Sequence, residues 1–361
     1  MRARDRKKTS GVGSDLLLGW ALMALAAACS GAQGPPSDSG LPPPPADGGA
    51  AEDGGPAGDG GVGPGPLATT PVERIYIQPR DGNSFLTSAL AGATSSVDAA
   101  FFILTDDGVE DGLIAARRRG VNVRVILDPG QAANAAAHAK LRDGGVPVSG
   151  GPAGFTNFHQ KSLVVDGMRA YIMTLNPSAA AFNDNREYAA LVTRQAEIAD
   201  LRSLFNADWT SAAAPPLTGN LLVSPINARA RLRDFLMRAQ RDILLTVEVF
   251  TDDEMRSVLK GRQDVGVTIR ILLADPRDVS QNTEAAVVLR SYGFQVRFIR
   301  NPMLHAKLIL VDGALAYTGS INLTPTSLDR NREVGLLIDN ATAVGHLRAQ
   351  AEADWSAGTA P

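Results

Sequence analysis

The stretch HQKSLVVDG at residues 159–167 returns as HAKLILVDG at residues 305–313, which is 146 residues further on. Two other pairs keep this spacing, VDAAFFILTDD with ILLTVEVFTDD and NREYAALV with NREVGLLI. Between them, VNVRVILDP and its counterpart VTIRILLADP stand in the same order. Similar segments that recur in one order at one spacing indicate an internal repeat. The sequence therefore predicts a duplicated domain.

Each copy alternates short apolar runs with stretches of helical pattern. In the first copy we expect strands over 74–78, 97–104, 121–128, 162–166, 170–174 and 188–193, and helices over 84–93, 110–119, 132–143 and 196–209. The runs are rich in β-branched residues and bounded by Gly, Pro or Asp, which favours strands buried on both faces. Strands that alternate with helices predict an α/β sandwich in each copy. Pro215-Pro216 marks the seam, so the halves span 71–214 and 215–361.

The N-terminal residues 1–28 have the composition of an export signal. A basic cluster precedes a short apolar run and three alanines, which end at Cys29, the single cysteine of the chain. The run is too short for a spanning helix. The pattern resembles a bacterial lipoprotein signal, which implies an acylated Cys29, and the alternative is a secretory signal cut near Ala28. Ser30, in place of a retaining Asp, favours the outer membrane of the cell envelope, facing the periplasm or the surface.

Residues 29–70 consist mainly of Gly, Pro, Ala and Asp, with few large apolar side chains. Such a segment cannot bury enough surface to offset its conformational entropy, so it is expected to be a disordered tether. One cysteine excludes an intramolecular disulfide framework. From Pro71 onward, 30 basic residues stand against 31 acidic ones. This balance lacks the strong positive field that binding to a polyanion requires.

The repeated motif carries the candidate chemistry. If it lies in a strand, its histidine and lysine, two residues apart, share one face. A nucleophile or acid beside a cation suits a phosphate ester, whose oxygens need positive donors while a phosphorus–oxygen bond is exchanged. An asparagine ten residues after each motif aspartate can donate to the same oxygens, and a glutamate eleven residues later can hold a histidine tautomer. These residues are His159, Lys161, Asp166, Asn176 and Glu187, and His305, Lys307, Asp312, Asn322 and Glu333.

HxKxxxxD, present twice in residues 71–357 and followed by GSxN in the second copy, resembles the phospholipase D superfamily. The resemblance implies two halves related by a pseudo-two-fold axis. They share one active site without a metal or other cofactor, and a monomer is sufficient to complete it. The second copy has the full motif, including Ser320. The first has Met173 and Thr174 where Gly and Ser are expected. We expect Met173 to add bulk beside the phosphate site.

The resemblance also implies roles. His159 would attack phosphorus to form a phosphohistidine, and His305 would protonate the leaving oxygen and then deprotonate the incoming water or alcohol. The phosphoryl oxygens would be held by the two lysines together with Asn176, Asn322, Ser320 and Thr174. Glu187 and Glu333 would orient the histidines. Asp166 and Asp312 are counted with the catalytic set. They would either contact the residues that touch the substrate or have a structural role.

The substrate is expected to be a phospholipid in a membrane. An anchored enzyme is concentrated at its lipid. The main hypothesis is hydrolysis of a headgroup ester to phosphatidic acid and an alcohol. A phosphatidyltransferase resembling cardiolipin synthases is the alternative with the same motifs. An endonuclease of the same superfamily is disfavoured by the charge balance, and a tethered binding module by the intact motifs.

Overall fold

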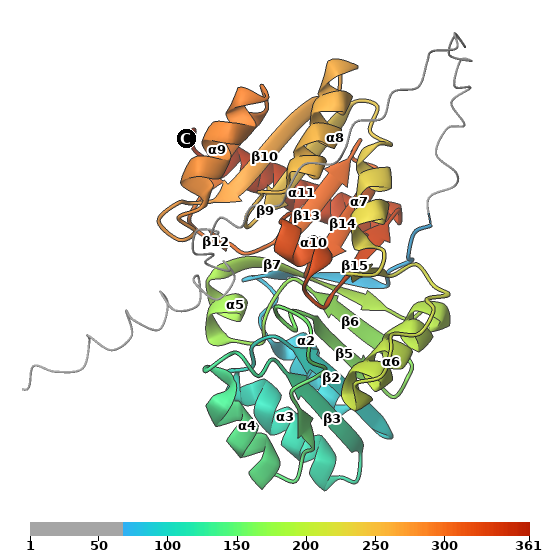
Figure 1. Ribbon diagram of the computed structural model, residues 1–361. Helices are drawn as coiled ribbons and strands as arrows, with labels where there is room; N and C mark the ends of the chain where they lie inside the picture. Colours follow the sequence, from blue (N-terminus) through green and yellow to red (C-terminus); the bar gives the residue numbers. More distant parts are fainter. Residues whose placement is uncertain (1–67) are drawn as a thin grey trace, which may run out of the picture. The chain divides into compact units, whose positions relative to one another are not determined.

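The computed structural model describes residues 68–361 (Figure 1). The predicted export signal, the attachment residue Cys29 and nearly all of the predicted tether lie outside the described residues. Residues 68–70, the end of that tether, belong to the fold, because Thr70 is buried and its N–H donates to the Leu337 carbonyl at 2.7 Å.

The first half forms a mixed sheet with its helices. Its strands are β1 (Arg74–Gln78), β2 (Ser96–Phe101), β3 (Asn122–Leu127), β4 (Val148–Ser149), β5 (Lys161–Val165), β6 (Arg169–Met173) and β7 (Asn185–Val192). Its helices are α2 (Ser84–Ala91), α3 (Asp107–Arg118), α4 (Asn134–Asp143), α5 (Ala179–Asn183) and α6 (Gln195–Thr210). The strand order is β1-β7-β6-β5-β2-β3-β4. β2, β3 and β4 run parallel, whereas β2-β5-β6-β7-β1 are antiparallel neighbours.

The second half repeats this plan. Its strands are β8 (Leu222–Ser224), β9 (Asp242–Val247), β10 (Thr268–Ala274), β11 (Gln295–Ile299), β12 (Met303–Leu304), β13 (Lys307–Val311), β14 (Leu315–Gly319) and β15 (Glu333–Ile338). Its helices are α7 (Ala228–Leu236), α8 (Asp253–Asp264), α9 (Asn282–Ser291), α10 (Pro325–Asp329) and α11 (Ala341–Ala357). The strand order is β11-β10-β9-β13-β14-β15-β8, which matches the first sheet strand for strand when it is read from β8. The predicted duplication and α/β class are therefore confirmed.

The repeated Thr-Asp-Asp sequence begins a helix in each half. Asp106 is the N-cap of α3 and accepts a hydrogen bond from the Val109 N–H at 2.9 Å. Asp252 caps α8 in the same way, through the Met255 N–H at 3.0 Å. A capping carboxylate satisfies a backbone donor that the helix leaves unpaired. The caps fix the points at which the chain passes from β2 to α3 and from β9 to α8.

The boundaries of several predicted elements need correction. The strand expected over 97–104 ends at Phe101, because the chain then turns out of the sheet towards the α3 cap. The strand expected over 188–193 begins earlier, at Asn185, where β12 from the second half pairs with it. The short elements β4 and α5 were not predicted. The other expected strands and helices of the first half are confirmed, with ends shifted by a few residues.

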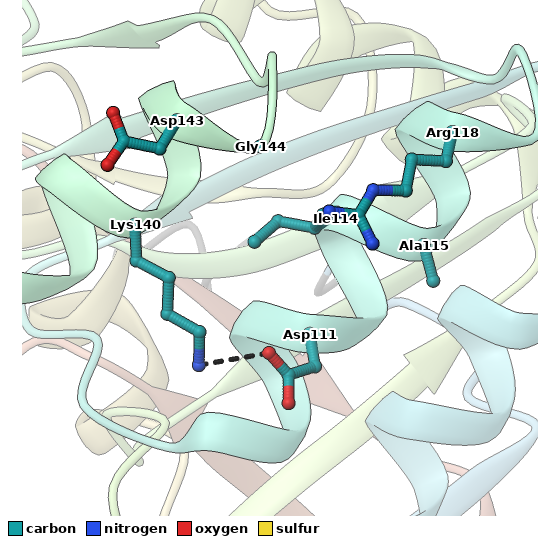
Figure 2. A pocket seen from close by; sticks show the side chains of 7 residues that line it. All are labelled: Asp111, Ile114, Ala115, Arg118, Lys140, Asp143 and Gly144. Carbon is teal, nitrogen blue, oxygen red and sulfur yellow. Dashed lines mark ion pairs between the residues drawn. The ribbon is translucent and has the colours of Figure 1, made fainter.

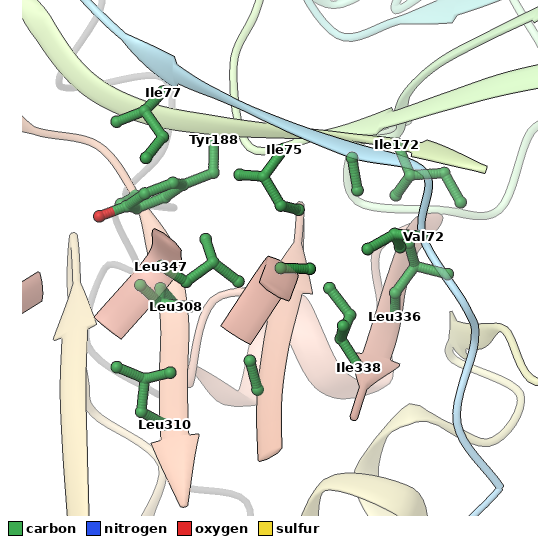
Figure 3. Close-up of a cluster of buried hydrophobic side chains, with 14 of the residues drawn as sticks. Val72, Ile75, Ile77, Ile172, Tyr188, Leu308, Leu310, Leu336, Ile338 and Leu347 are labelled. Atoms are coloured by element: carbon green, nitrogen blue, oxygen red, sulfur yellow. The ribbon is translucent and has the colours of Figure 1, made fainter. Parts of the chain in front are cut away.

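A central hydrophobic cluster joins the two sheets (Figure 3). Ile75, Ile77 and Tyr188 come from the first half, and Leu308 and Leu336 come from the second. Helices α6 and α11 add apolar side chains to the same cluster, while separate clusters lie between each sheet and the helices on its other face. Each sheet is thus covered on both faces, as its apolar strands predict. The packing sets the two repeats of the His-x-Lys motif against each other.

Candidate active site

The two motif histidines are each bound by a glutamate of the opposite half. The Nδ1 atom of His159 lies 2.9 Å from Oε2 of Glu333, which begins β15. The Nδ1 atom of His305 lies 2.6 Å from Oε1 of Glu187, in β7. All four side chains are buried. A carboxylate at Nδ1 fixes the tautomer in which Nε2 is available for chemistry. The structure thus brings both motifs into one centre, with the orienting contacts crossing between the halves.

Neighbouring donors hold the two glutamates. Glu333 accepts hydrogen bonds from Ser327 and from the Asn331 amide, the latter at 2.9 Å. The Thr174 hydroxyl donates to Glu187 Oε2 at 2.5 Å. Burial opposes ionisation of Glu333, but the charge of His159 and its hydrogen bond hold the pKa of Glu333 below the usual value. Glu333 is therefore an anion that can stabilise a charged imidazole.

The motif lysines lie beside the histidines, although not in the way the strand pattern predicts. β5 begins at Lys161 and β13 at Lys307, so each histidine precedes its strand instead of lying within it. Each lysine Nζ donates to the backbone carbonyl of its own motif histidine, at 2.8 Å in both halves. Both lysines are buried. Their positive charges are thereby held next to the histidine rings.

Glu248 contacts the motif lysine and lies near the motif histidine of the second half, and the motif pattern does not reveal it. Its Oε2 accepts a hydrogen bond from Lys307 Nζ at 2.8 Å and lies 3.6 Å from His305 Nε2. Burial opposes its ionisation, but the charges of His305 and Lys307 lower the pKa of Glu248 to about 2. Its position in the repeat is that of Phe102, 146 residues earlier. A comparison of the two copies, residue by residue, is the signal that finds it.

Besides the two lysines, four uncharged residues are predicted to hold phosphoryl oxygens, and they divide into two groups. Asn176 and Asn322 are buried at the centre; Asn176 Oδ1 accepts from the Ile103 N–H at 3.3 Å, and the Asn322 amide donates to Glu248 at 3.3 Å. The hydroxyls are used elsewhere. Thr174 donates to Glu187, and Ser320 donates to the Val334 carbonyl at 3.3 Å. That Thr174 and Ser320 hold phosphoryl oxygens stays a prediction, and in this structure their hydroxyls contact strands β7 and β15.

The motif aspartates do not approach the histidines. Asp166 follows β5, so it lies about 17 Å along the strand from Lys161 at about 3.3 Å per residue. Its carboxylate accepts from the backbone N–H groups of Thr94, Ser95 and Ser96 at 2.7–3.1 Å. Asp312 binds residues 240–242 in the same way. Of the roles expected for these aspartates, the geometry favours the structural one, which ties the loop before β2 or β9 to the motif strand.

Met173 does not crowd the phosphate donors. Its side chain is fully buried in the hydrophobic cluster of the first half, between the sheet and its helices. The matching residue, Gly319, lies so close to the next strand that an added Cβ would stand 2.4 Å from the Cα of Gly335. In the first half Met173 pairs with Ala189. The predicted narrowing of the site is corrected, because residue 173 faces the core.

Two buried ion pairs cross between the halves beside the centre. Arg186 binds Asp354 of α11 through its Nε at 2.7 Å and its Nη2 at 3.1 Å. Arg332, 146 residues after Arg186, pairs with Asp208 of α6 at 3.1 Å. Each arginine immediately precedes, in the sequence NRE, the glutamate that binds a motif histidine. The same short segment therefore braces the opposite half and orients its histidine.

Other features of residues 68–361 lie apart from this centre. The hollow in Figure 2 is lined by residues of α3 and α4, where Lys140 forms an ion pair with Asp111 at 3.0 Å. Within the described range, we find no helix of a length and apolarity suited to crossing a membrane. That range also holds no cluster of three or more His, Cys, Asp or Glu arranged to bind a metal ion.

The sequence matches the family described as "Cardiolipin synthase, PLD-like domain", where PLD denotes phospholipase D, over residues 86–209 and again over 232–355. The two matches cover more than half of the chain and coincide with its two halves. The chain therefore belongs to the phospholipase D-like family, as the duplicated motif predicts.

Its curated relatives include cardiolipin synthases. The protein named "Probable cardiolipin synthase YwiE" of Bacillus subtilis is 23% identical over 319 residues, which are 74% of this chain and 62% of the relative. Cardiolipin synthase A of Pseudomonas syringae is 26% identical over 332 residues, with 78% and 68% covered. The mitochondrial cardiolipin hydrolase of Xenopus tropicalis is 29% identical over 130 residues, which are 36% of this chain and 61% of that protein. The chain thus spans less than two thirds of the Bacillus relative.

Solved structures show the same fold. The phosphatidylserine synthase of Haemophilus influenzae superposes with a TM-score of 0.63 at 12% identity, over 79% of this chain and 87% of that one. A polyphosphate kinase of Porphyromonas gingivalis gives a TM-score of 0.62 at 14% identity, over 77% and 49%. At these identities the likeness concerns the fold alone.

Proposed function

We propose that this chain is a phosphatidyltransferase that moves a phosphatidyl group from a phospholipid headgroup ester to an alcohol. The observation that carries the proposal is the reciprocal centre, in which each motif histidine is oriented by a buried glutamate of the other half at 2.6–2.9 Å. The names of the Bacillus and Pseudomonas relatives favour transfer over the hydrolysis expected first. An acceptor such as phosphatidylglycerol fits this reading.

The proposed reaction has two displacements. In the first, Nε2 of His159 attacks phosphorus, the bond from phosphorus to the headgroup oxygen breaks, and His305 gives its proton to that oxygen. In the second, His305 takes the proton of the acceptor hydroxyl, whose oxygen attacks phosphorus and releases His159. Lys161, Lys307 and the asparagine amides stabilise the charge on the non-bridging oxygens.

Glu187 and Glu333 each accept a hydrogen bond from the Nδ1–H of the opposite half's histidine, so that proton stays on the imidazole in both steps. Glu248, 3.6 Å from His305 Nε2, favours the protonated form of His305. His159 instead has the Phe102 ring edge-on, with ring centroids 4.5 Å apart. This asymmetry supports His305 as the acid and base and His159 as the nucleophile.

Hydrolysis is the second candidate, with water in place of the acceptor alcohol. It is favoured by the likeness of part of the chain to a protein named cardiolipin hydrolase. Phosphatidic acid would then be the lipid product.

The purified protein incubated with phosphatidylglycerol vesicles separates these candidates by mass spectrometry of the lipids. We expect cardiolipin and glycerol, with no product from the His159→Ala variant. Phosphatidic acid as the main product would replace transfer with hydrolysis. A parallel incubation with single-stranded DNA tests the nuclease alternative. Cleavage of this DNA, with the lipids left intact, would contradict both candidates.

We also propose that an acylated Cys29 tethers the domain to the outer membrane of the cell envelope. The support is the sequence pattern of residues 1–29 alone. Metabolic labelling with an alkyne fatty acid tests it: we expect label on the mature chain and none on Cys29→Ala. A secreted, unlabelled product would instead fit a simple secretory signal.

A further inference from the structure

The two halves differ at one position that contacts both a histidine and a lysine. In the first half Phe102 lies edge-on to His159, and Lys161 Nζ stands 4.8 Å from the centre of its ring. In the second half the matching residue, Glu248, faces the motif histidine and lysine with a carboxylate. The two halves of the active site therefore have the same fold but differ in charge.

One carboxylate oxygen of Glu248 lies among three donors. Oε2 accepts from Lys307 Nζ at 2.8 Å and from the Asn322 amide at 3.3 Å, and it lies 3.6 Å from His305 Nε2. The lysine and the amide are the groups of the second half to which the proposed reaction assigns the phosphoryl oxygens. An anionic oxygen that contacts a lysine and an amide has the partners that a phosphoryl oxygen would have.

The backbone around Glu248 is fixed. Its N–H donates to the Ala306 carbonyl at 2.9 Å, and its own carbonyl accepts from the amide of the fully buried Asn282 at 2.8 Å. A displacement of the carboxylate would therefore be a rotation of the side chain and not a movement of the backbone.

Resting on the proposed function, we propose that the Glu248 carboxylate occupies the phosphoryl-oxygen position of the second half and that a substrate must displace it to react. Two anions in contact in a buried site repel each other, so phosphate and carboxylate cannot share Lys307 without cost. Displacement needs binding energy from the rest of the substrate, as remote contacts supply in many enzymes. Glu248 is then a specificity-determining residue that disfavours small free anions such as phosphate relative to a phospholipid.

The alternative is that Glu248 only compensates the charge of the buried Lys307. On that reading the carboxylate stays in place when an anion binds, and its neutralisation would raise the affinity for phosphate by less than about ten-fold, because it removes only a repulsion at a distance. The two readings therefore predict gains of different size in an anion titration. Such a titration needs neither a lipid nor an acceptor alcohol, so its outcome is separate from that of the transferase assay.

The test is isothermal titration of the full chain and its Glu248→Gln variant with inorganic phosphate. The matched control is Glu284→Gln, which removes one negative charge from an exposed position in the first turn of α9. We expect Glu248→Gln to bind phosphate at least ten-fold more tightly than the wild type, and Glu284→Gln to bind as the wild type does.

Glu248→Ala serves as a second variant, with the same expected gain, if the glutamine variant does not fold. Circular dichroism establishes that each titrated variant is folded. A gain in phosphate affinity of less than ten-fold in a folded Glu248 variant would overturn the proposal, as would no measurable binding to either. A gain in phosphate affinity without transferase activity in the wild type would refute the proposed function and leave the displacement intact.

Discussion

The buried pair of Arg186 and Asp354 gives the sharpest stability prediction. It joins β7 of the first half to α11 of the second through two hydrogen bonds, of 2.7 and 3.1 Å, and its side chains are only 9% and 5% exposed. Replacement of Arg186 by Met leaves a buried carboxylate without its counterion. Breaking such a pair costs about 3–5 kcal/mol, whereas replacement of both partners by apolar residues is often close to neutral.

The assay is urea unfolding of the purified chain, followed by circular dichroism. At a slope of about 3 kcal/mol per molar urea, the Arg186→Met midpoint should fall by about 1–1.7 M. The double variant Arg186→Met with Asp354→Leu should regain most of this loss. As a control, Lys260→Met removes the exposed i,i+4 pair with Asp264, which should cost no more than about 0.5 kcal/mol. A loss for Arg186→Met no larger than that of the control would refute the reasoning.

Three further predictions concern single residues. Glu333→Gln removes a charged hydrogen-bond partner worth about 1.5–3 kcal/mol, so lipid turnover should fall by about 10- to 150-fold, and an unchanged rate would exclude the orienting role. Asp166→Asn should reduce the free energy of unfolding by about 1–3 kcal/mol at pH 7. Burial opposes ionisation of Asp166, but the backbone N–H groups lower its pKa, so this stability is present at neutral pH and the difference between wild type and variant should shrink below about pH 4; a difference that grows in acid would contradict this. Gly319→Ala should reduce the yield of folded protein, because its Cβ would meet the Gly335 backbone at 2.4 Å, and a wild-type melting temperature would show that the strands can separate without cost.

The duplicated fold was predictable from the sequence because its signals are local and repeated. Apolar runs bounded by Gly, Pro or Asp define most strands, and the constant spacing defines the halves. The exchange of partners was not predictable. Glu187 and Glu333 have the same place in their repeats, so the sequence does not show which glutamate binds which histidine. Only the face-to-face packing of the sheets decides the pairing.

The side-chain roles show the same limit. Thr174 and Ser320 stand near the asparagines along the chain, but spacing does not reveal that their hydroxyls turn towards β7 and β15. Met173 was assigned to the site because the motif has glycine there, whereas the direction of the side chain places it in the core. Glu248 carries a signal that was available, a charged residue within a buried apolar run where the other copy has Phe102.

The central claim is that each histidine is oriented by the glutamate of the opposite half. The chain has only four histidines, so the imidazoles of ¹⁵N-histidine-labelled protein can be assigned and titrated individually by NMR. We predict that Glu333→Gln changes the Nδ1 chemical shift of His159 while that of His305 keeps its wild-type value, and that Glu187→Gln does the reverse. A change confined to the histidine of the same half, His305 for Glu333→Gln or His159 for Glu187→Gln, would contradict the account.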